Sequence, residues 1–133
     1  MQQLAAVTET SALEGLRVLV VEDESLVAMQ LEDMLLDLGC AVVGPAMRLS
    51  RALEMAAEAG IDIAILDVNL GGERVYPVAQ MIRDRKIPIV FATGYGRAGV
   101  DAVWHDCPIL QKPYTENQLA EMMGLAMTPR TPA

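Results

Sequence analysis

The sequence predicts a single α/β domain in which helices cover both faces of a five-stranded parallel sheet. A length of 133 residues suits one domain, and a hydrophobic content of 53% suffices for a full core. Short apolar runs alternate five times with polar or helical stretches, as in a chain of β–α units. The runs are almost continuously apolar, which is typical of parallel strands buried on both faces. Right-handed crossovers then place helices on both sides of the sheet.

Five runs are expected to be strands because each is short, apolar and rich in β-branched residues: 16–21, 40–43, 61–66, 87–92 and 107–110. Gly44-Pro45 after the second run is expected to form a loop. Four stretches have helical spacing or start signals: 27–38, 49–57, 77–85 and 115–126. Gly39 and Gly60 end the first two helices, Pro77 suits the first turn of the third, and Thr115 begins a capping box in the last. Residues 93–105 contain three glycines, so a helix there should be short or poorly formed.

The sequence gives approximate domain limits and argues against secreted, membrane-spanning, nucleic-acid-binding and zinc-binding proteins. We expect a loose leader at residues 1–14, the folded domain at 15–127 and a flexible tail at 128–133. The chain lacks a secretory signal and any apolar run of membrane-spanning length, so a cytoplasmic location and no membrane contact are expected. A net charge of −8 argues against direct nucleic-acid binding. Cys40 and Cys107 lack zinc-site spacing and are interpreted as small apolar residues.

Polar side chains stand where the expected strands end. Glu22 and Asp23 follow the first strand and Asp67 the third, while the fourth and fifth lead to Thr93 and Lys112. Parallel strands bring such ends to one edge of the sheet, where binding sites of α/β folds lie. Crowded carboxylates require a cation, and Mg²⁺ suits carboxylate oxygens. An aspartate beside Mg²⁺ and a fixed lysine can attack a phosphoryl group, with the threonine hydroxyl donating to it. Solvated loop charges would explain any single member but not the whole set.

These motifs resemble the receiver domain of bacterial response regulators. The resemblance runs from about Leu16 to Met127, and its signatures are Val-Val-Glu-Asp-Glu at 20–24, Leu-Asp-Val-Asn-Leu at 66–70, Thr-Gly at 93–94 and Lys-Pro at 112–113. It implies a three-layer α/β/α, flavodoxin-like fold with strand order 2-1-3-4-5, the order known for this type of domain.

The same resemblance implies a role for each site residue. Asp67 would be the phosphoacceptor, and Glu22, Asp23, Asp67 and the main-chain carbonyl of Asn69 would hold Mg²⁺. Thr93 would be the switch hydroxyl and Lys112 the phosphate-binding ammonium, followed by a cis peptide bond to Pro113.

Phe-Ala-Thr-Gly-Tyr-Gly at 91–96 resembles a subgroup of receivers named FAT GUY after this motif. Members commonly work with histidine kinases of the HWE or HisKA2 type, often in general stress response circuits. The chain departs from common receivers at Ile109, where many have a Tyr or Phe that reports phosphorylation, and Tyr95 is a candidate for part of that role. Gly71-Gly72, where a proline is common, suggests mobile loops beside the site.

We therefore expect a single-domain response regulator that accepts a phosphoryl group from a histidine kinase or phosphotransferase and signals by contact with a downstream protein. It would be no enzyme beyond self-phosphorylation and self-dephosphorylation of Asp67. The alternatives are a phosphate sink and a degenerate receiver that binds partners without phosphorylation. A flavodoxin-like carrier is disfavoured, because it needs a phosphate-binding loop after the first strand and this chain has acidic residues at 22–24. An α/β phosphotransfer enzyme is disfavoured, because it usually has a second acid two residues after the nucleophilic aspartate and this chain has Asn69 there.

Overall fold

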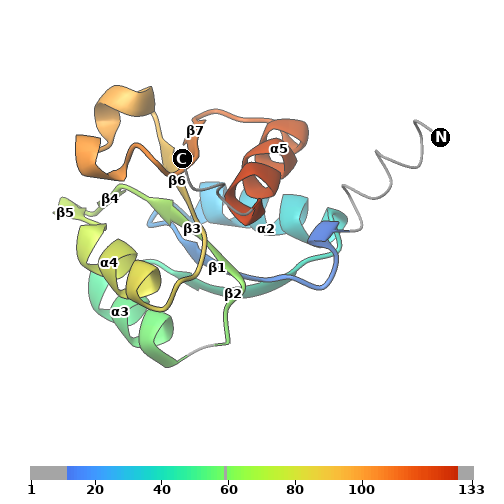
Figure 1. The fold of residues 1–133 in the computed structure, drawn as a ribbon, viewed down its shortest axis with the longest axis horizontal. Helices are drawn as coiled ribbons and strands as arrows, with labels where there is room; N and C mark the ends of the chain where they lie inside the picture. Colours follow the sequence, from blue (N-terminus) through green and yellow to red (C-terminus); the bar gives the residue numbers. More distant parts are fainter. Residues whose placement is uncertain (1–11, 59, 129–133) are drawn as a thin grey trace.

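The sheet has the predicted order. The computed structural model describes residues 12–58 and 60–128. Its parallel strands are β1 (Arg17–Val21), β2 (Ala41–Ala46), β3 (Ile63–Asp67), β6 (Ile89–Thr93) and β7 (Ile109–Gln111). They lie side by side in the order β2-β1-β3-β6-β7, which is 2-1-3-4-5 when only these five are counted (Figure 1). The strand order and the fold class are confirmed.

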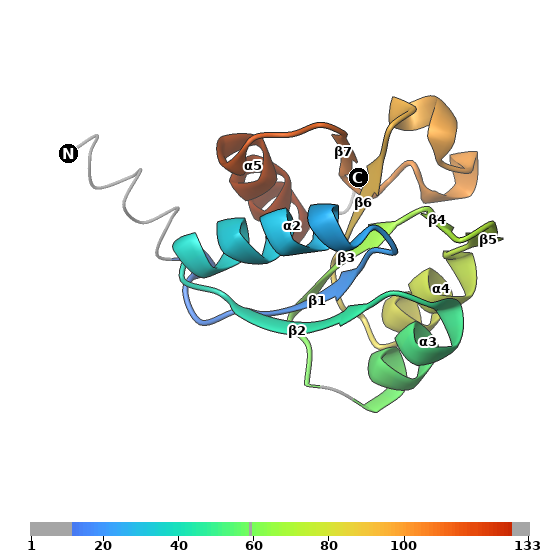
Figure 2. The same ribbon diagram turned by 180° about the vertical axis from the view of Figure 1, so that it is seen from behind.

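Two helices cover each face of the sheet. Figure 2 shows α2 (Ser25–Asp37) and α5 (Glu116–Met127) on one side, with α3 (Leu49–Glu58) and α4 (Tyr76–Asp84) on the other. Alternate residues of β1 face opposite layers: Val18 and Val20 pack with α2 and α5, and Leu19 and Val21 pack with α3 and α4. This two-sided burial explains why the strands are apolar without alternation.

Helix signals in the sequence match the structure closely. In the capping box of α5, the Thr115 hydroxyl accepts from the Gln118 amide at 3.1 Å, and the Gln118 side chain accepts from the Thr115 amide at 2.9 Å. Between β6 and β7 there are two short 3₁₀ helices, η1 (Gly96–Gly99) and η2 (Ala102–Trp104). The expectation of a poorly formed fourth helix is therefore confirmed.

One expectation about loops is wrong. Gly44-Pro45, taken for a loop, lies inside β2 with a cis peptide bond. Because β2 is an edge strand, the missing proline N–H leaves no neighbouring strand unpaired. Gly71 and Gly72 form the two-residue turn of an antiparallel hairpin between β4 (Asn69–Leu70) and β5 (Glu73–Arg74), and the mobility expected there stays a prediction. Both glycines have positive φ, 56° and 92°, as tight hairpin turns require.

The packed region begins earlier than residue 15. Residues 1–11 of the expected leader and 129–133 of the expected tail lie outside the described residues. Leu13, however, is buried in the core beside α2, and its carbonyl oxygen accepts from the Cys40 thiol at 3.3 Å. Apolar burial thus draws the last residues of the expected leader into the domain. No described helix has the length and hydropathy needed to cross a membrane.

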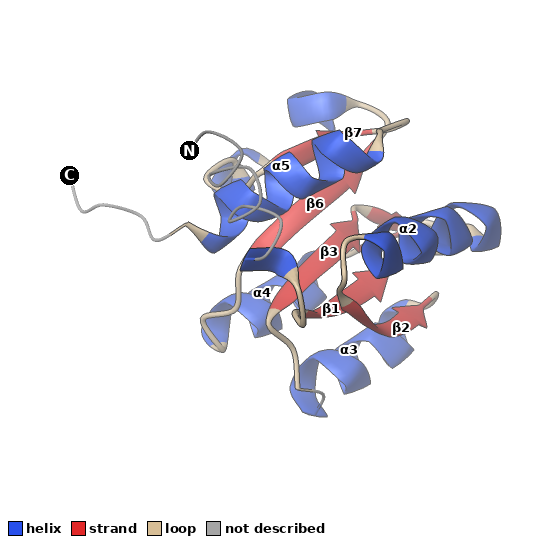
Figure 3. Ribbon diagram, turned by 90° about the vertical axis from the view of Figure 1, so that its right-hand side faces the viewer, coloured by secondary structure: helices blue, strands red, loops and turns tan. Residues whose placement is uncertain are grey.

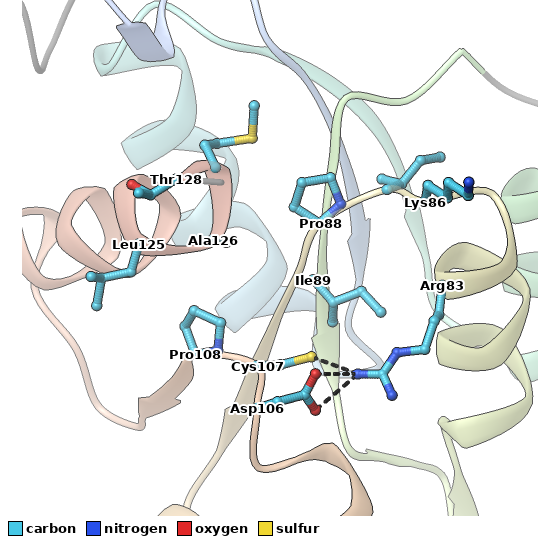
Figure 4. A pocket seen from close by; sticks show the side chains of 12 residues that line it. Arg83, Lys86, Pro88, Ile89, Asp106, Cys107, Pro108, Leu125, Ala126 and Thr128 are labelled. Atoms are coloured by element: carbon cyan, nitrogen blue, oxygen red, sulfur yellow. Dashed lines mark hydrogen bonds and ion pairs between the residues drawn. The ribbon is translucent and has the colours of Figure 1, made fainter. Parts of the chain in front are cut away.

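An arginine and an aromatic cluster anchor the 3₁₀ helices to α4. Trp104 is buried, with its ring stacked on Tyr76 at 6.1 Å, and the Arg83 guanidinium lies 4.1 Å from the Trp104 ring centroid. The same guanidinium donates to both carboxylate oxygens of Asp106 at 3.0 Å and to the Cys107 sulfur at 3.3 Å (Figure 4). Burial and the stack on Tyr76 make Trp104 a packing residue.

Arg83→Lys is expected to lower the free energy of unfolding by about 1–2 kcal/mol, because an ammonium that reaches Asp106 and Cys107, as the Arg83 Nη2 atom does, leaves no planar group stacked on the Trp104 ring. Urea unfolding followed by Trp104 fluorescence measures the change. Arg51→Lys is the control, since Arg51 is exposed and its only ion-pair partner among the residues that the structure describes is Glu54, at 3.5 Å. An equal loss of stability in both variants would contradict the anchoring role.

Candidate functional site

The parallel sheet brings the predicted site residues to one edge. All five strands point toward the same edge in Figure 3, so their carboxyl ends meet there. Glu22 and Asp23 directly follow β1, Asp67 ends β3, Thr93 ends β6 and Lys112 directly follows β7.

A lysine bridges two buried carboxylates at this edge. The Lys112 Nζ lies 2.7 Å from Glu22 Oε1 and 3.3 Å from Asp67 Oδ2. Glu22 and Asp67 are only 2% and 8% exposed. The second oxygen of Glu22 accepts from the Glu24 amide at 3.0 Å, which fixes that carboxylate. Lys112 itself is placed by its amide, which donates to the Thr93 carbonyl oxygen at 2.9 Å, and by a cis peptide bond to Pro113, as the resemblance implied.

Three carboxylates converge beside this lysine. Glu22, Asp23 and Asp67 each offer an oxygen within 4.8 Å of the others. Asp23 Oδ2 also accepts from the Gly71 amide at 2.9 Å, so the β4–β5 hairpin holds this carboxylate. Sequence reasoning missed the Gly71 contact; the Gly-Gly pair signalled a turn but not which side chain it would meet.

The electrostatics of the cluster require more positive charge than Lys112 supplies. Burial, and next the charge of Glu22, raise the pKa of Asp67 to about 7, against the opposing effect of Lys112. Burial works to lower the pKa of Lys112, but its hydrogen bond to Glu22 and the charge of Asp67 outweigh it and raise the pKa above its usual value. The ammonium therefore stays charged. A hard divalent cation with oxygen ligands, such as Mg²⁺, fits this donor set.

Thr93 and Asn69 take different places in the site. Thr93 is buried at the end of β6, and its hydroxyl oxygen accepts from the Tyr95 amide at 3.1 Å. Asn69 begins β4, two residues after Asp67, and pairs with Arg74 across the hairpin. Its role as a metal ligand stays a prediction. Ile109 starts β7 and pairs with Phe91, so no aromatic ring occupies that position.

This strand order defines a flavodoxin-like α/β domain, with an acidic cluster and a lysine at the carboxyl edge of its sheet. Residues 18–124 match the family model of the response regulator receiver domain, and the chain belongs to this family. It is thus a receiver domain of the two-component type, a signalling class whose members typically bind Mg²⁺ at such an acidic cluster.

Relatives of known structure or role agree with this assignment. SdrG from Sphingomonas melonis Fr1 is 44% identical, with a TM-score of 0.78 over 86% of this chain and 98% of that one. The response regulator PhyR from Brucella abortus is 25% identical, with a TM-score of 0.77 over 92% of this chain and 52% of that one. The transcriptional regulatory protein PdtaR of Mycobacterium tuberculosis is 30% identical over 91% of this chain, which spans 61% of its length.

Proposed function

We propose that this protein is a single-domain response regulator that accepts a phosphoryl group on Asp67 from a histidine kinase or phosphotransferase. Mg²⁺ would be held by Glu22, Asp23, Asp67 and the main-chain carbonyl of Asn69. The observation that carries the proposal is the position of Lys112, whose ammonium lies 3.3 Å from Asp67 within a cluster of three carboxylates. Structural salt bridges do not need so many buried acids around one cation.

The residues divide the chemistry among themselves. A carboxylate oxygen of Asp67 forms the new P–O bond, while the P–N bond of a phosphohistidine breaks and its electron pair returns to the imidazole. Mg²⁺, when bound, supplies the positive charge that the phosphoryl oxygens need. Lys112 pairs with a phosphoryl oxygen, and the Thr93 hydroxyl donates to another. Glu22 keeps the lysine in place through the 2.7 Å ion pair.

The signalling output is a protein contact. Phosphorylation adds negative charge beside Lys112 and Thr93 and shifts an equilibrium between two conformations. A net charge of −8 disfavours direct contact with nucleic acid. The FAT GUY-like motif at residues 91–96 supports a place in a general stress response circuit, with a kinase of the HWE or HisKA2 type. We also propose that the protein works in the cytoplasm, where such kinases present their phosphohistidine.

Incubation with acetyl phosphate and Mg²⁺, followed by intact-mass spectrometry, tests the proposal. We expect one phosphoryl group on the parent protein, none without Mg²⁺ and none on Asp67→Asn. Asp33→Asn, a change on the exposed side of α2, should be phosphorylated like the parent. If the parent takes no phosphoryl group from acetyl phosphate or from a panel of histidine kinases, the protein is a degenerate receiver and the proposal is wrong.

A further inference from the structure

Gly99, the last residue of η1, lies directly against the site threonine. A Cβ added at Gly99 would come within 2.5 Å of Thr93 Oγ1 and 2.8 Å of Tyr95 Cβ. Real Cβ atoms do not approach other atoms so closely. The bare Cα is therefore required as long as the Thr93 hydroxyl keeps its present position.

Burial and a hydrogen bond hold the Thr93 hydroxyl next to η1. Thr93 is only 3% exposed, so its side chain has little freedom to move except by rotation about χ1. Its oxygen accepts from the Tyr95 amide at 3.1 Å, within the same loop that carries Gly99. Any rotation that takes the hydroxyl toward Asp67 must give up both the hydrogen bond and the contact with Gly99.

Hydrogen bonds join η1 to the end of η2. His105 Nε2 lies 2.9 Å from the Arg97 carbonyl oxygen and 2.7 Å from that of Val100, so a single ring nitrogen joins the two sides of Gly99 to the end of η2. Trp104 precedes this histidine and is stacked on Tyr76 of α4. The environment of the chain's single tryptophan therefore depends on where η1 lies.

We propose that Gly99 is a positioning residue: because it lacks a side chain, the Thr93 hydroxyl can lie against η1 and accept from the Tyr95 amide. This inference rests on the proposed function. This contact links the site around Asp67 to the β6–η1 loop. In the neighbouring strand β7, Ile109 takes the position at which an aromatic residue is common.

Gly99→Ala tests this contact, with Gly94→Ala as the matched control. Gly94 lies in the same loop, but a Cβ there would meet nothing within 4 Å, and its φ is outside the left-handed region. In the full chain without phosphoryl donor, we expect the Tyr95 amide of Gly99→Ala to exchange about fivefold faster than in the parent, because it loses its acceptor. The ¹H–¹⁵N resonances of residues 96–100 should shift more in Gly99→Ala than in Gly94→Ala, and the Trp104 emission should change with them. If Gly99→Ala moves these resonances no more than Gly94→Ala, the proposal is overturned.

A Thr93→Ala background identifies the atom responsible. Without the hydroxyl, the closest of the two clashes is removed and only the approach to Tyr95 Cβ at 2.8 Å remains, so Gly99→Ala should cost less stability there than in the parent. Equal costs in both backgrounds would overturn the proposal. Should Gly99→Ala alone fail to fold, folding of the double variant would support the proposal and its failure would refute it. These measurements need no phosphoryl group. A parent that is never phosphorylated would therefore contradict the proposed function, but it would leave the test of the contact between Gly99 and Thr93 unaffected.

Discussion

Asp67→Asn is expected to make the metal-free protein more stable at pH 8, by about 2–4 kcal/mol in the free energy of unfolding. Burial and the neighbouring Glu22 carboxylate raise the pKa of Asp67 to about 7, whereas an aspartate in the unfolded chain titrates near 3.8. The ionised carboxylate is therefore less stable in the folded protein than in the unfolded chain. An amide of the same shape removes this cost and leaves Lys112 paired with Glu22.

The pH dependence of the parent follows from the same shift. Between about pH 4 and 7 the folded protein holds a proton on Asp67 that the unfolded chain releases, so stability falls as the pH rises through this window. Asp67→Asn should flatten that decline. Urea unfolding in EDTA at several pH values, followed by Trp104 fluorescence, measures it, with Asp33→Asn as the control. A parent whose stability is constant or rises between pH 5 and 7, or a less stable Asp67→Asn at pH 8, would contradict the prediction.

The difference is expected to shrink when Mg²⁺ is added. A cation bound among the carboxylates favours the ionised form of Asp67 and adds its binding free energy to the stability of the parent. Asp67→Asn lacks one charged ligand and should gain less. The buried carboxylate of Asp67 thus lowers the stability of the metal-free protein, and the same carboxylate can accept a cation and a phosphoryl group.

Local patterns in the sequence were enough to locate most of the site. Buried parallel strands are readable as continuous apolar runs, and the polar residue that ends each run must reach the same edge of the sheet. This logic placed Glu22, Asp67, Thr93 and Lys112 correctly. The capping box at Thr115 was equally readable, because both of its hydrogen bonds join residues three apart.

Contacts between loops were not readable in this way. The Gly71 amide meets the Asp23 carboxylate across 48 residues of sequence, and only the folded hairpin places it there. The three glycines of residues 93–105, Gly99 among them, predicted only a poorly formed helix, whereas the contact of Gly99 with Thr93 depends on how η1 folds back over β6. Gly44-Pro45 looked like a loop because its strand character depends on β2 being at the edge of the sheet. Glycine signals conformational freedom in a sequence, while its reason for being there is set by tertiary neighbours.

Lys112→Met is expected to lower the free energy of unfolding by about 3–5 kcal/mol at pH 8 in the absence of metal, because it leaves two buried carboxylates without their cation. The loss should be smaller at pH 5. Lys112 opposes the increase in the pKa of Asp67, so without the lysine this carboxyl group stays protonated to higher pH and carries no charge at pH 5. Lys86→Met, which removes the chain's other lysine from an exposed position, is the control and should change stability by less than about 0.5 kcal/mol.

A second substitution separates loss of charge balance from loss of packing. Glu22→Gln in the Lys112→Met background removes one of the uncompensated charges and is expected to recover a large part of the stability, whereas a packing defect left by the lysine stem would persist. Mg²⁺ should likewise rescue Lys112→Met more than it stabilises the parent, because the cation then replaces the only positive charge that the structure places within ion-pair distance of Glu22 and Asp67 among the described residues. Urea unfolding with and without Mg²⁺ measures both effects. If Lys112→Met is as stable as the parent at pH 8, or if neither rescue occurs, the lysine does not balance these carboxylates and the electrostatic account of the site is wrong.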